Sequence, residues 1–139
     1  MRRSFIAPLL AVVLLFSSGC KEEIQKAKED LVVDLIVNNI WVVTNFTEGS
    51  SNITANFSSY DFKFNRDESV YGRKAGSPDA VGTWKGDAAA MTITSSFPLG
   101  TEPLTKLTGV WNITKTTMSS VKSTRTEGGV TYFLELQKK

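Results

Sequence analysis

The spacing of hydrophobic residues in this chain changes at Ile40, from steps of three and four residues to steps of two, and this change restricts the folds that the chain can adopt. From there to the C-terminus, apolar and polar residues alternate in short runs; Tyr60, Phe62 and Phe64, for example, share one face. A period of two is typical of half-buried strands. Stretches rich in Gly, Ser, Asn, Asp and Pro separate the runs and indicate turns. Eight runs are expected to form strands: 40–46, 58–65, 69–74, 80–85, 90–97, 107–114, 118–123 and 130–137.

Eight short strands joined mostly by tight turns predict an antiparallel meander. Eight is also a number of strands that closes into a small barrel, and closure removes the exposed edges of an open sheet. We therefore expect a mainly β fold: an eight-stranded antiparallel up-and-down barrel over residues 40–139, preceded by one N-terminal helix. With 139 residues, the chain has room for one domain of ordinary size.

The helix is expected over residues 24–39. Ile24, Ala27, Leu31 and Leu35 recur at spacings of three and four, which places them on one face. That face is expected to pack on the barrel, and a partner-binding or membrane-surface helix is the alternative. The polar side of the helix carries acidic as well as basic residues, which argues against a membrane-surface helix.

The N-terminus has the layout of a secretory leader, and residues 1–19 are expected to be a removed signal peptide. Arg2 and Arg3 are the positive start, the apolar run 5–16 follows, and the small residues 17–19 precede Cys20. The apolar run is shorter than the roughly 20 residues that a membrane-spanning helix needs. A short anchoring helix that stays on the protein is the alternative.

The lone cysteine directly follows the small residues, and Ser17-Ser18-Gly19-Cys20 resembles the bacterial lipobox, with Ser17 where Leu is usual. The resemblance implies that signal peptidase II cuts before Cys20 and that Cys20 carries lipid, with residues 20–23 as a tether. Lys21-Glu22-Glu23 resembles the lipoprotein export signal of Bacteroidota. It implies an outer-membrane lipoprotein exposed at the cell surface, held to the membrane through Cys20. The alternative for Lys21-Glu22-Glu23 is a plain polar tether or the charged first turn of a helix, and the alternative for the location is an anchor that faces the periplasm.

The chain from Trp41 onward resembles the lipocalin-like domains of Bacteroidota lipoproteins. The matching segments are Trp41, Tyr60-Asp61-Phe62-Lys63-Phe64-Asn65, Gly82-Thr83-Trp84, Met91-Thr92-Ile93, Leu107 with Val110-Trp111-Asn112-Ile113, and Tyr132-Phe133-Leu134-Glu135-Leu136. The chain departs from true lipocalins because no Gly-x-Trp opens the first strand and no disulfide is possible within it. These motifs are structural, so they imply a lipocalin-like barrel and no particular chemistry.

Composition excludes several classes of active site. The chain has no His and a single Cys, which excludes a Ser-His-Asp or Cys-His triad, a His-ligated metal and a CxxC pair. The acidic residues are scattered, and Asp67-Glu68 fits a solvated turn. We therefore expect no enzyme, no catalytic residue, no metal site and no cofactor. Of 16 basic residues, Arg2 and Arg3 fall in the leader, which leaves 14 against 14 acidic residues and disfavours nucleic acid as a partner.

The aromatic residues are the remaining functional signal. The candidate ligand-binding residues are Trp41, Tyr60, Phe62, Trp84 and Trp111. A barrel of this size is either filled by its side chains or holds one small ligand. The first hypothesis is therefore a barrel that binds a small apolar or amphiphilic ligand. The alternative is an extracellular interaction module with a filled core, which binds a protein or a glycan, or inhibits a hydrolase, through loops 48–56 and 98–103.

Overall fold

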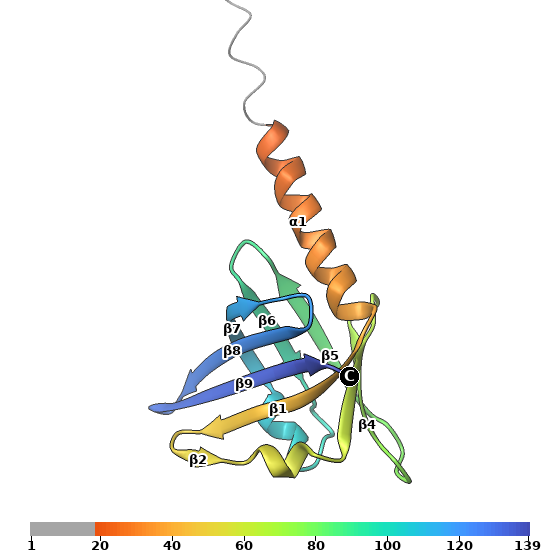
Figure 1. Cartoon of the computed structure of the whole chain (residues 1–139), viewed down its shortest axis with the longest axis vertical. Helices are drawn as coiled ribbons and strands as arrows, with labels where there is room; N and C mark the ends of the chain where they lie inside the picture. The colour runs from red at the N-terminus through yellow and green to blue at the C-terminus, as the bar shows by residue number, and fades with distance from the viewer. Residues whose placement is uncertain (1–18) are drawn as a thin grey trace, which may run out of the picture.

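The computed structural model describes residues 19–139. The predicted signal peptide, except its last residue, lies outside the described residues. The side chains of residues 19–25, 27 and 28 also lie outside them, so the lipidation of Cys20 and the contacts of Ile24 and Ala27 stay predictions. Figure 1 shows one helix that projects from a barrel of antiparallel strands.

The elements follow one another along the chain without a crossover in the sheet. They are α1 (Gly19–Val37), β1 (Ile40–Glu48), β2 (Ser51–Asn52), the 3-10 turn η1 (Thr54–Phe57), β3 (Tyr60–Phe64), β4 (Ser69–Lys74), β5 (Ala80–Asp87), β6 (Thr92–Ser96), the 3-10 turn η2 (Leu104–Leu107), β7 (Gly109–Thr116), β8 (Ser120–Glu127) and β9 (Val130–Lys138). The helix begins at Gly19, so the segment 20–23 expected as a tether is helical.

The sheet closes because the first and last long strands pair with each other. β1 runs antiparallel to β9 from Trp41 opposite Lys138 to Glu48 opposite Tyr132, and it pairs on its other side with β3. The two-residue strand β2 only extends the tip of β1. The predicted eight-stranded up-and-down barrel after one helix is therefore confirmed.

The barrel has two different ends. The helix end carries α1 and the turns 65–68, 88–91 and 117–119. The loop end lies opposite and carries the longer connections 49–59 and 97–108 together with the turns 75–79 and 128–129. The two loops that the sequence suggested for partner binding therefore lie at the same end of the barrel.

The core is the barrel interior, and the alternation of each strand decides which side chains enter it. β3 and β4 turn Phe62, Phe64 and Val70 inward, while Tyr71 lies between two inward positions and faces out. The largest fully buried side chains are Trp41, Phe46, Phe57, Phe62, Leu104 and Val70. The alternation fails at one residue: Met91 alternates with Ile93 in the sequence, yet it lies in a turn with φ 54° and is 50% exposed.

Among the described side chains of α1, those near its C-terminal end pack against the barrel. Ile36 and Val37 are buried against the core, whereas Leu31 from the predicted apolar face is 69% exposed. The helix ends at Val37, two residues before the predicted end at residue 39, and the Asn39 side-chain amide donates to the Leu35 carbonyl at 2.7 Å. Within residues 19–139, no helix is both long and apolar enough to cross a bilayer.

Polar contacts fix this end of the helix to the barrel. The Trp41 indole N–H donates to the Ile36 carbonyl at 2.9 Å, and the Lys63 ammonium donates to the Val37 carbonyl. A cation at a helix C-terminus is favourable because the last carbonyls there lack helical partners. Arg66 also forms an ion pair with Asp34. The direction in which α1 leaves the barrel is thus set by contacts with β1, β3 and the turn after β3.

Candidate functional site

The barrel interior is nearly filled. It holds a cavity of about 40 Å³, whereas ligand pockets usually measure about 300–1,000 Å³. The cavity is lined by Phe62, Phe64, Val70, Ile93, Ser95, Phe97, Leu107, Trp111, Val121, Ser123, Leu134 and Leu136. Both serines donate to main-chain carbonyls, Ser95 to Leu107 and Ser123 to Leu134. A space of this size suits a water molecule better than a ligand.

The polar atoms of the three tryptophans are already bonded. The indole N–H groups of Trp41, Trp84 and Trp111 each donate to a main-chain carbonyl at 2.9 Å. Buried polar groups need such partners, and these bonds connect β1 to the end of α1, β5 to the turn after β3, and β7 to η2. None of the three indoles is therefore positioned to orient a ligand through its N–H.

The five candidate ligand-binding residues do not surround one cavity. Phe62 and Trp111 line the interior cavity, and Trp84 lines a separate space of about 40 Å³ beneath α1. Trp41 is buried where α1 joins the barrel. Tyr60 lies at the loop end and lines a hollow open to solvent.

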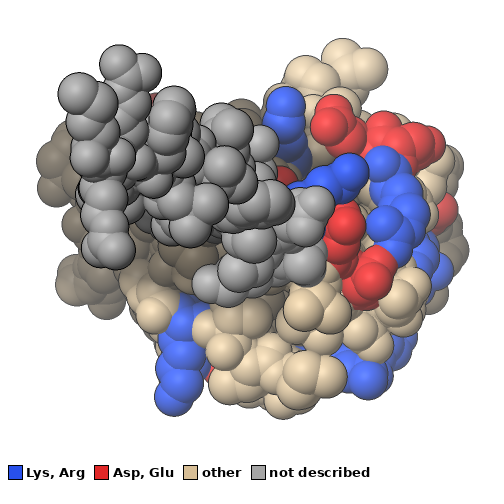
Figure 2. Space-filling view, turned by 90° about the horizontal axis from the view of Figure 1, so that it is seen from above, with Lys and Arg blue, Asp and Glu red and all other residues tan. Residues whose placement is uncertain are grey.

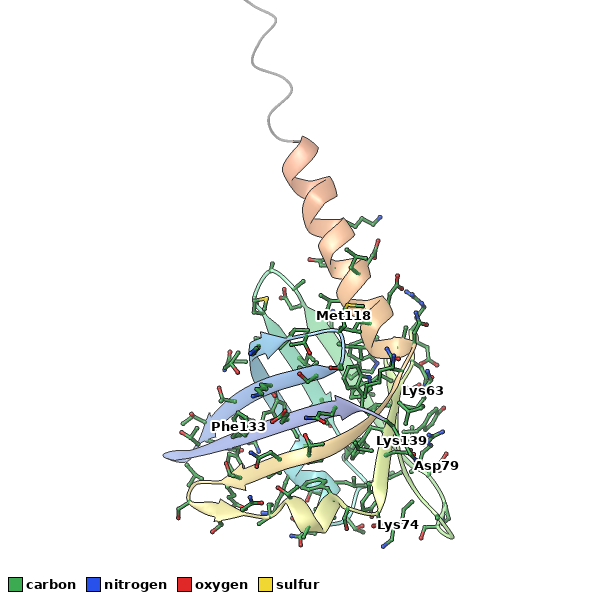
Figure 3. All side chains as sticks on the ribbon, viewed as in Figure 1. Lys63, Lys74, Asp79, Met118, Phe133 and Lys139 are labelled. Carbon is green, nitrogen blue, oxygen red and sulfur yellow. The ribbon has the colours of Figure 1, made fainter. Side chains whose placement is uncertain are left out.

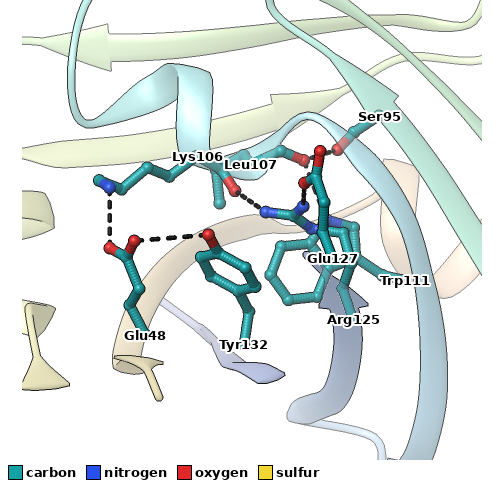
Figure 4. Close-up of polar contacts among 8 residues, drawn as sticks. All are labelled: Glu48, Ser95, Lys106, Leu107, Trp111, Arg125, Glu127 and Tyr132. Atoms are coloured by element: carbon teal, nitrogen blue, oxygen red, sulfur yellow. Dashed lines mark hydrogen bonds and ion pairs between the residues drawn. The ribbon is translucent and has the colours of Figure 1, made fainter. Parts of the chain in front are cut away.

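Arg125 closes the loop end of the barrel (Figure 4). Its guanidinium carbon lies 5.0 Å from the ring centre of Trp111 and 4.2 Å from that of Tyr132, so two aromatic faces enclose the cation. It also donates to the Lys106 carbonyl at 3.1 Å and pairs with Glu127. A Cβ at Gly109 would lie 2.6 Å from the Arg125 side chain, so glycine there makes room for it.

A second ion pair lies beside Arg125. Lys106 Nζ is 2.8 Å from a Glu48 carboxylate oxygen, and the Tyr132 hydroxyl donates to the other oxygen at 3.4 Å. The hydrogen bond from Lys106 lowers the pKa of Glu48, and Glu48 in turn raises the pKa of Lys106. With Arg125, these contacts join β1, η2, β8 and β9 at the loop end. We call this cluster of Glu48, Lys106, Arg125, Glu127 and Tyr132 the Arg125 plug, and its contacts indicate a structural role.

The Tyr60 hollow is the second feature of the loop end. It has a volume of about 330 Å³ and is lined by Asn56, Ser59, Tyr60, Lys74, Glu102 and Pro103. Three separate parts of the chain supply these residues. They are the region of η1, the hairpin that begins with Tyr60 on β3 and ends with Lys74 on β4, and the loop before η2. The two loops proposed from the sequence thus meet here through Asn56 and Glu102.

A groove lies at the helix end, between α1 and the turn after β7. This helix groove has a volume of about 620 Å³ and is lined by Leu31, Val32, Asp34, Leu35, Asn38, Asn39, Thr116, Thr117 and Met118. Met118 is 80% exposed at its edge. The groove is mostly apolar, is open to solvent and is not continuous with the interior cavity.

Charges of both signs are mixed on the surface. Seen from the helix end, Lys and Arg side chains lie beside Asp and Glu side chains among the described residues (Figure 2). Asp61, for example, contacts Arg73 at 2.6 Å and Lys139 at 2.8 Å. The bond from Arg73 is the main cause that lowers the pKa of Asp61. Among the described residues, no three Cys, Asp or Glu side chains gather in a way that could hold a metal ion.

Searches against protein-family models, curated proteins and solved structures found no match to this chain. The barrel is shown by its own strand pairing, while the resemblance to lipocalin-like lipoproteins stays a prediction. Sequence reasoning missed the Arg125 plug. The available signal was that β8 places Ser123 and Arg125 on the same face as Val121, where an apolar face would be expected.

Proposed function

We propose that this chain is a lipid-anchored outer-membrane protein that binds an extracellular partner, a protein or a glycan, through the loop end of its barrel. The main support is the filled interior: a cavity of about 40 Å³ leaves no room for a ligand of ordinary size. The polar side chains that line this cavity, Ser95, Trp111 and Ser123, already donate to main-chain carbonyls, so their donor groups are not free to bind a ligand there. Partner binding is therefore assigned to the outer surface of the barrel.

The position of α1 favours the loop end over the other surfaces. Acyl chains on Cys20 would sit near the start of a helix of 19 residues, about 28 Å long at 1.5 Å per residue. The helix joins the barrel at the end opposite the long loops. A membrane that holds the first turn of α1 therefore has the loop end facing away from it. Leu99, which is 95% exposed in loop 98–103, adds an apolar contact there.

Site-specific photo-crosslinking on intact cells tests this assignment. A photoreactive residue at Ala55, exposed on η1 at the loop end, is expected to form adducts with an extracellular partner. The same residue at Lys115, exposed near the helix end of β7, is the matched control and is expected to form few or none. Adducts are measured by the shift in mass of the full-length chain. Equal labelling at both positions, or labelling only at Lys115, would contradict binding through the loop end.

The helix groove supports a second candidate function, the binding of a long-chain amphiphile. Its volume of about 620 Å³ falls within the range of ligand pockets, and the exposed Leu31 and Met118 supply apolar walls. The groove lies on the side of the barrel that carries α1, where a lipid anchor would bring it near the membrane. This location replaces the barrel interior as the place for the apolar ligand expected from the sequence.

A photoactivatable long-chain alcohol added to isolated membranes tests the second candidate, because an alcohol is not transferred to Cys20 as an acyl group. Adducts are expected on peptides that contain Leu31 and Met118, and Met118→Gln is expected to reduce them several-fold. Met91→Gln is the matched control, since Met91 is an exposed methionine at the same end but outside the groove. If both variants label like the wild type, the groove does not bind the amphiphile.

A further inference from the structure

We propose that the Tyr60 hollow is a binding site for a neutral carbohydrate. This inference deepens the proposed function by naming the chemical class of the partner at the loop end. The hollow differs from the interior cavity and from the helix groove because most of the surface that lines it is polar, whereas theirs is mostly apolar. Figure 3 shows Lys74 at the end of the barrel away from α1, where this hollow lies.

Strand geometry places an aromatic ring and a cation side by side at the rim of the barrel. Tyr60 and Lys74 are directly opposite each other in the β3–β4 pairing. Each lies two positions from an inward-facing residue of its own strand, Tyr60 from Phe62 on β3 and Lys74 from Gly72 on β4, and so shares that residue's face. They are the last such positions before the loop end, so their side chains meet solvent there. Lys74 Nζ lies 5.6 Å from the centre of the Tyr60 ring.

The Tyr60 ring is held in place from inside the barrel. It stacks on Phe62 with a centroid distance of 6.4 Å and an angle of 24° between the ring planes. Phe62 is fully buried, so the contact fixes Tyr60 to the core. Tyr60 itself is only half-buried and lines the hollow. A fixed, partly exposed ring is a low-entropy surface for an apolar ligand face.

The polar groups around the ring are available to a ligand. In the part of the chain that the structure describes, the side chains of Asn56, Ser59 and Lys74 have no hydrogen-bond or ion-pair partner. Glu102 accepts one bond from Thr105 at 2.8 Å through one oxygen, and its second oxygen has no partner among the described residues. The hollow therefore offers an amide, a hydroxyl, an ammonium and a carboxylate oxygen around one aromatic wall.

This set of groups favours a ligand that has many hydroxyls and no net charge. A hydroxyl can accept from Lys74 and can donate to Glu102, whereas an ion of either sign meets one attractive and one repulsive charge in the hollow and gains little net attraction. The C–H face of a sugar ring suits the flat wall of Tyr60 once the Lys74 ammonium, which lies over that ring, turns toward a ligand hydroxyl. An apolar ligand would cover these polar groups without giving them hydrogen-bond partners, which is costly on binding. A volume of about 330 Å³ also lies within the usual range for small-molecule sites.

Saturation-transfer NMR on the full chain tests the site. The chain is held in a polyoxyethylene detergent, because a sugar-headed detergent would compete. The probes are neutral mono- and oligosaccharides of glucose, galactose, mannose, xylose and N-acetylglucosamine. At least one is expected to receive saturation from the protein. Tyr60→Ala and Asn56→Ala are expected to lower its affinity tenfold or more.

Tyr71→Ala is the matched control, because Tyr71 is a half-buried tyrosine on the neighbouring strand that faces away from the hollow. It is expected to bind like the wild type. Asn56 is exposed and its side chain makes no contact that holds the fold, so Asn56→Ala keeps the test valid if Tyr60→Ala fails to fold. Absence of saturation for every probe, or unchanged affinity in Asn56→Ala and in folded Tyr60→Ala, would overturn the proposal.

The outcome separates this inference from the proposed function. If Ala55 crosslinks to an extracellular protein while no saccharide binds, the loop end is a protein-binding surface and the carbohydrate site is wrong. If a saccharide binds in the hollow but the chain carries no lipid, the site stands and the membrane-anchored role fails.

Discussion

Replacing Phe46 with alanine is expected to lower the free energy of unfolding by about 3–5 kcal/mol, the usual cost of removing a buried phenylalanine. Phe46 is 0% exposed, and its ring centre lies 4.9 Å from that of Phe57 and 5.9 Å from that of Trp111. It lies on β1, the strand that closes the barrel against β9. Small domains have a total stability of about 5–15 kcal/mol, so this loss is large. Urea unfolding followed by tryptophan fluorescence measures it.

Phe133→Ala is the matched control for Phe46→Ala. Phe133 lies on β9 between the inward positions of Tyr132 and Leu134, and its side chain is only half-buried. The same atoms are removed, but from the outer face, where the expected loss is about 1 kcal/mol or less. A loss for Phe46→Ala no larger than that for Phe133→Ala would mean that the interior is loosely packed. A real ligand cavity inside the barrel would then return as the better hypothesis.

The barrel could be predicted because its sequence signal is local. Each expected strand contains alternation that matches a strand of the structure, and turn-forming residues separate the strands. Met91 shows the limit of that signal. It continues the alternation of Ile93, but the chain turns at Ala88–Met91 and the main-chain N–H of Met91 bonds to the Ala88 carbonyl at 3.4 Å. A positive φ at a methionine has no mark in the sequence pattern.

The candidate sites were less predictable because they depend on contacts between distant residues. The three tryptophans looked like ligand-binding residues, yet their N–H groups bond to main-chain carbonyls. The acceptor of Trp84 is the carbonyl of Asn65, 19 positions away, and the strand pattern does not show that these two residues meet. Asn56 and Glu102 are 46 positions apart and meet only because the barrel closes. Tyr60 is the exception. Tyr60 was a candidate ligand-binding residue in the sequence, because it combines an aromatic ring with a polar hydroxyl. Its position as the first residue of β3 places it at the loop end, where it meets solvent.

Replacing Cys20 with serine is expected to abolish lipid attachment and processing together. Signal peptidase II cuts before a lipid-modified cysteine, so a serine at position 20 leaves the chain without acyl groups and with residues 1–19 still attached. Metabolic labelling with an alkyne-bearing palmitate measures the first effect, and the intact mass measures the second. The wild type is expected to incorporate the label and to begin at Cys20, whereas Cys20→Ser is expected to show no incorporation.

The lipid anchor is expected to hold the chain firmly on the membrane because its acyl chains bury many methylene groups in the bilayer. At about 0.8 kcal/mol per buried CH₂, two chains of about sixteen carbons contribute more than about 20 kcal/mol, whereas a single myristoyl chain binds only marginally. Lys26→Ala is the control, because Lys26 is exposed on the same helix and is expected to leave labelling and mass unchanged. Unlabelled wild type that keeps residues 1–19 would contradict the lipid anchor. It would favour the retained apolar helix over residues 5–16 and would leave the barrel attached to the membrane through that segment.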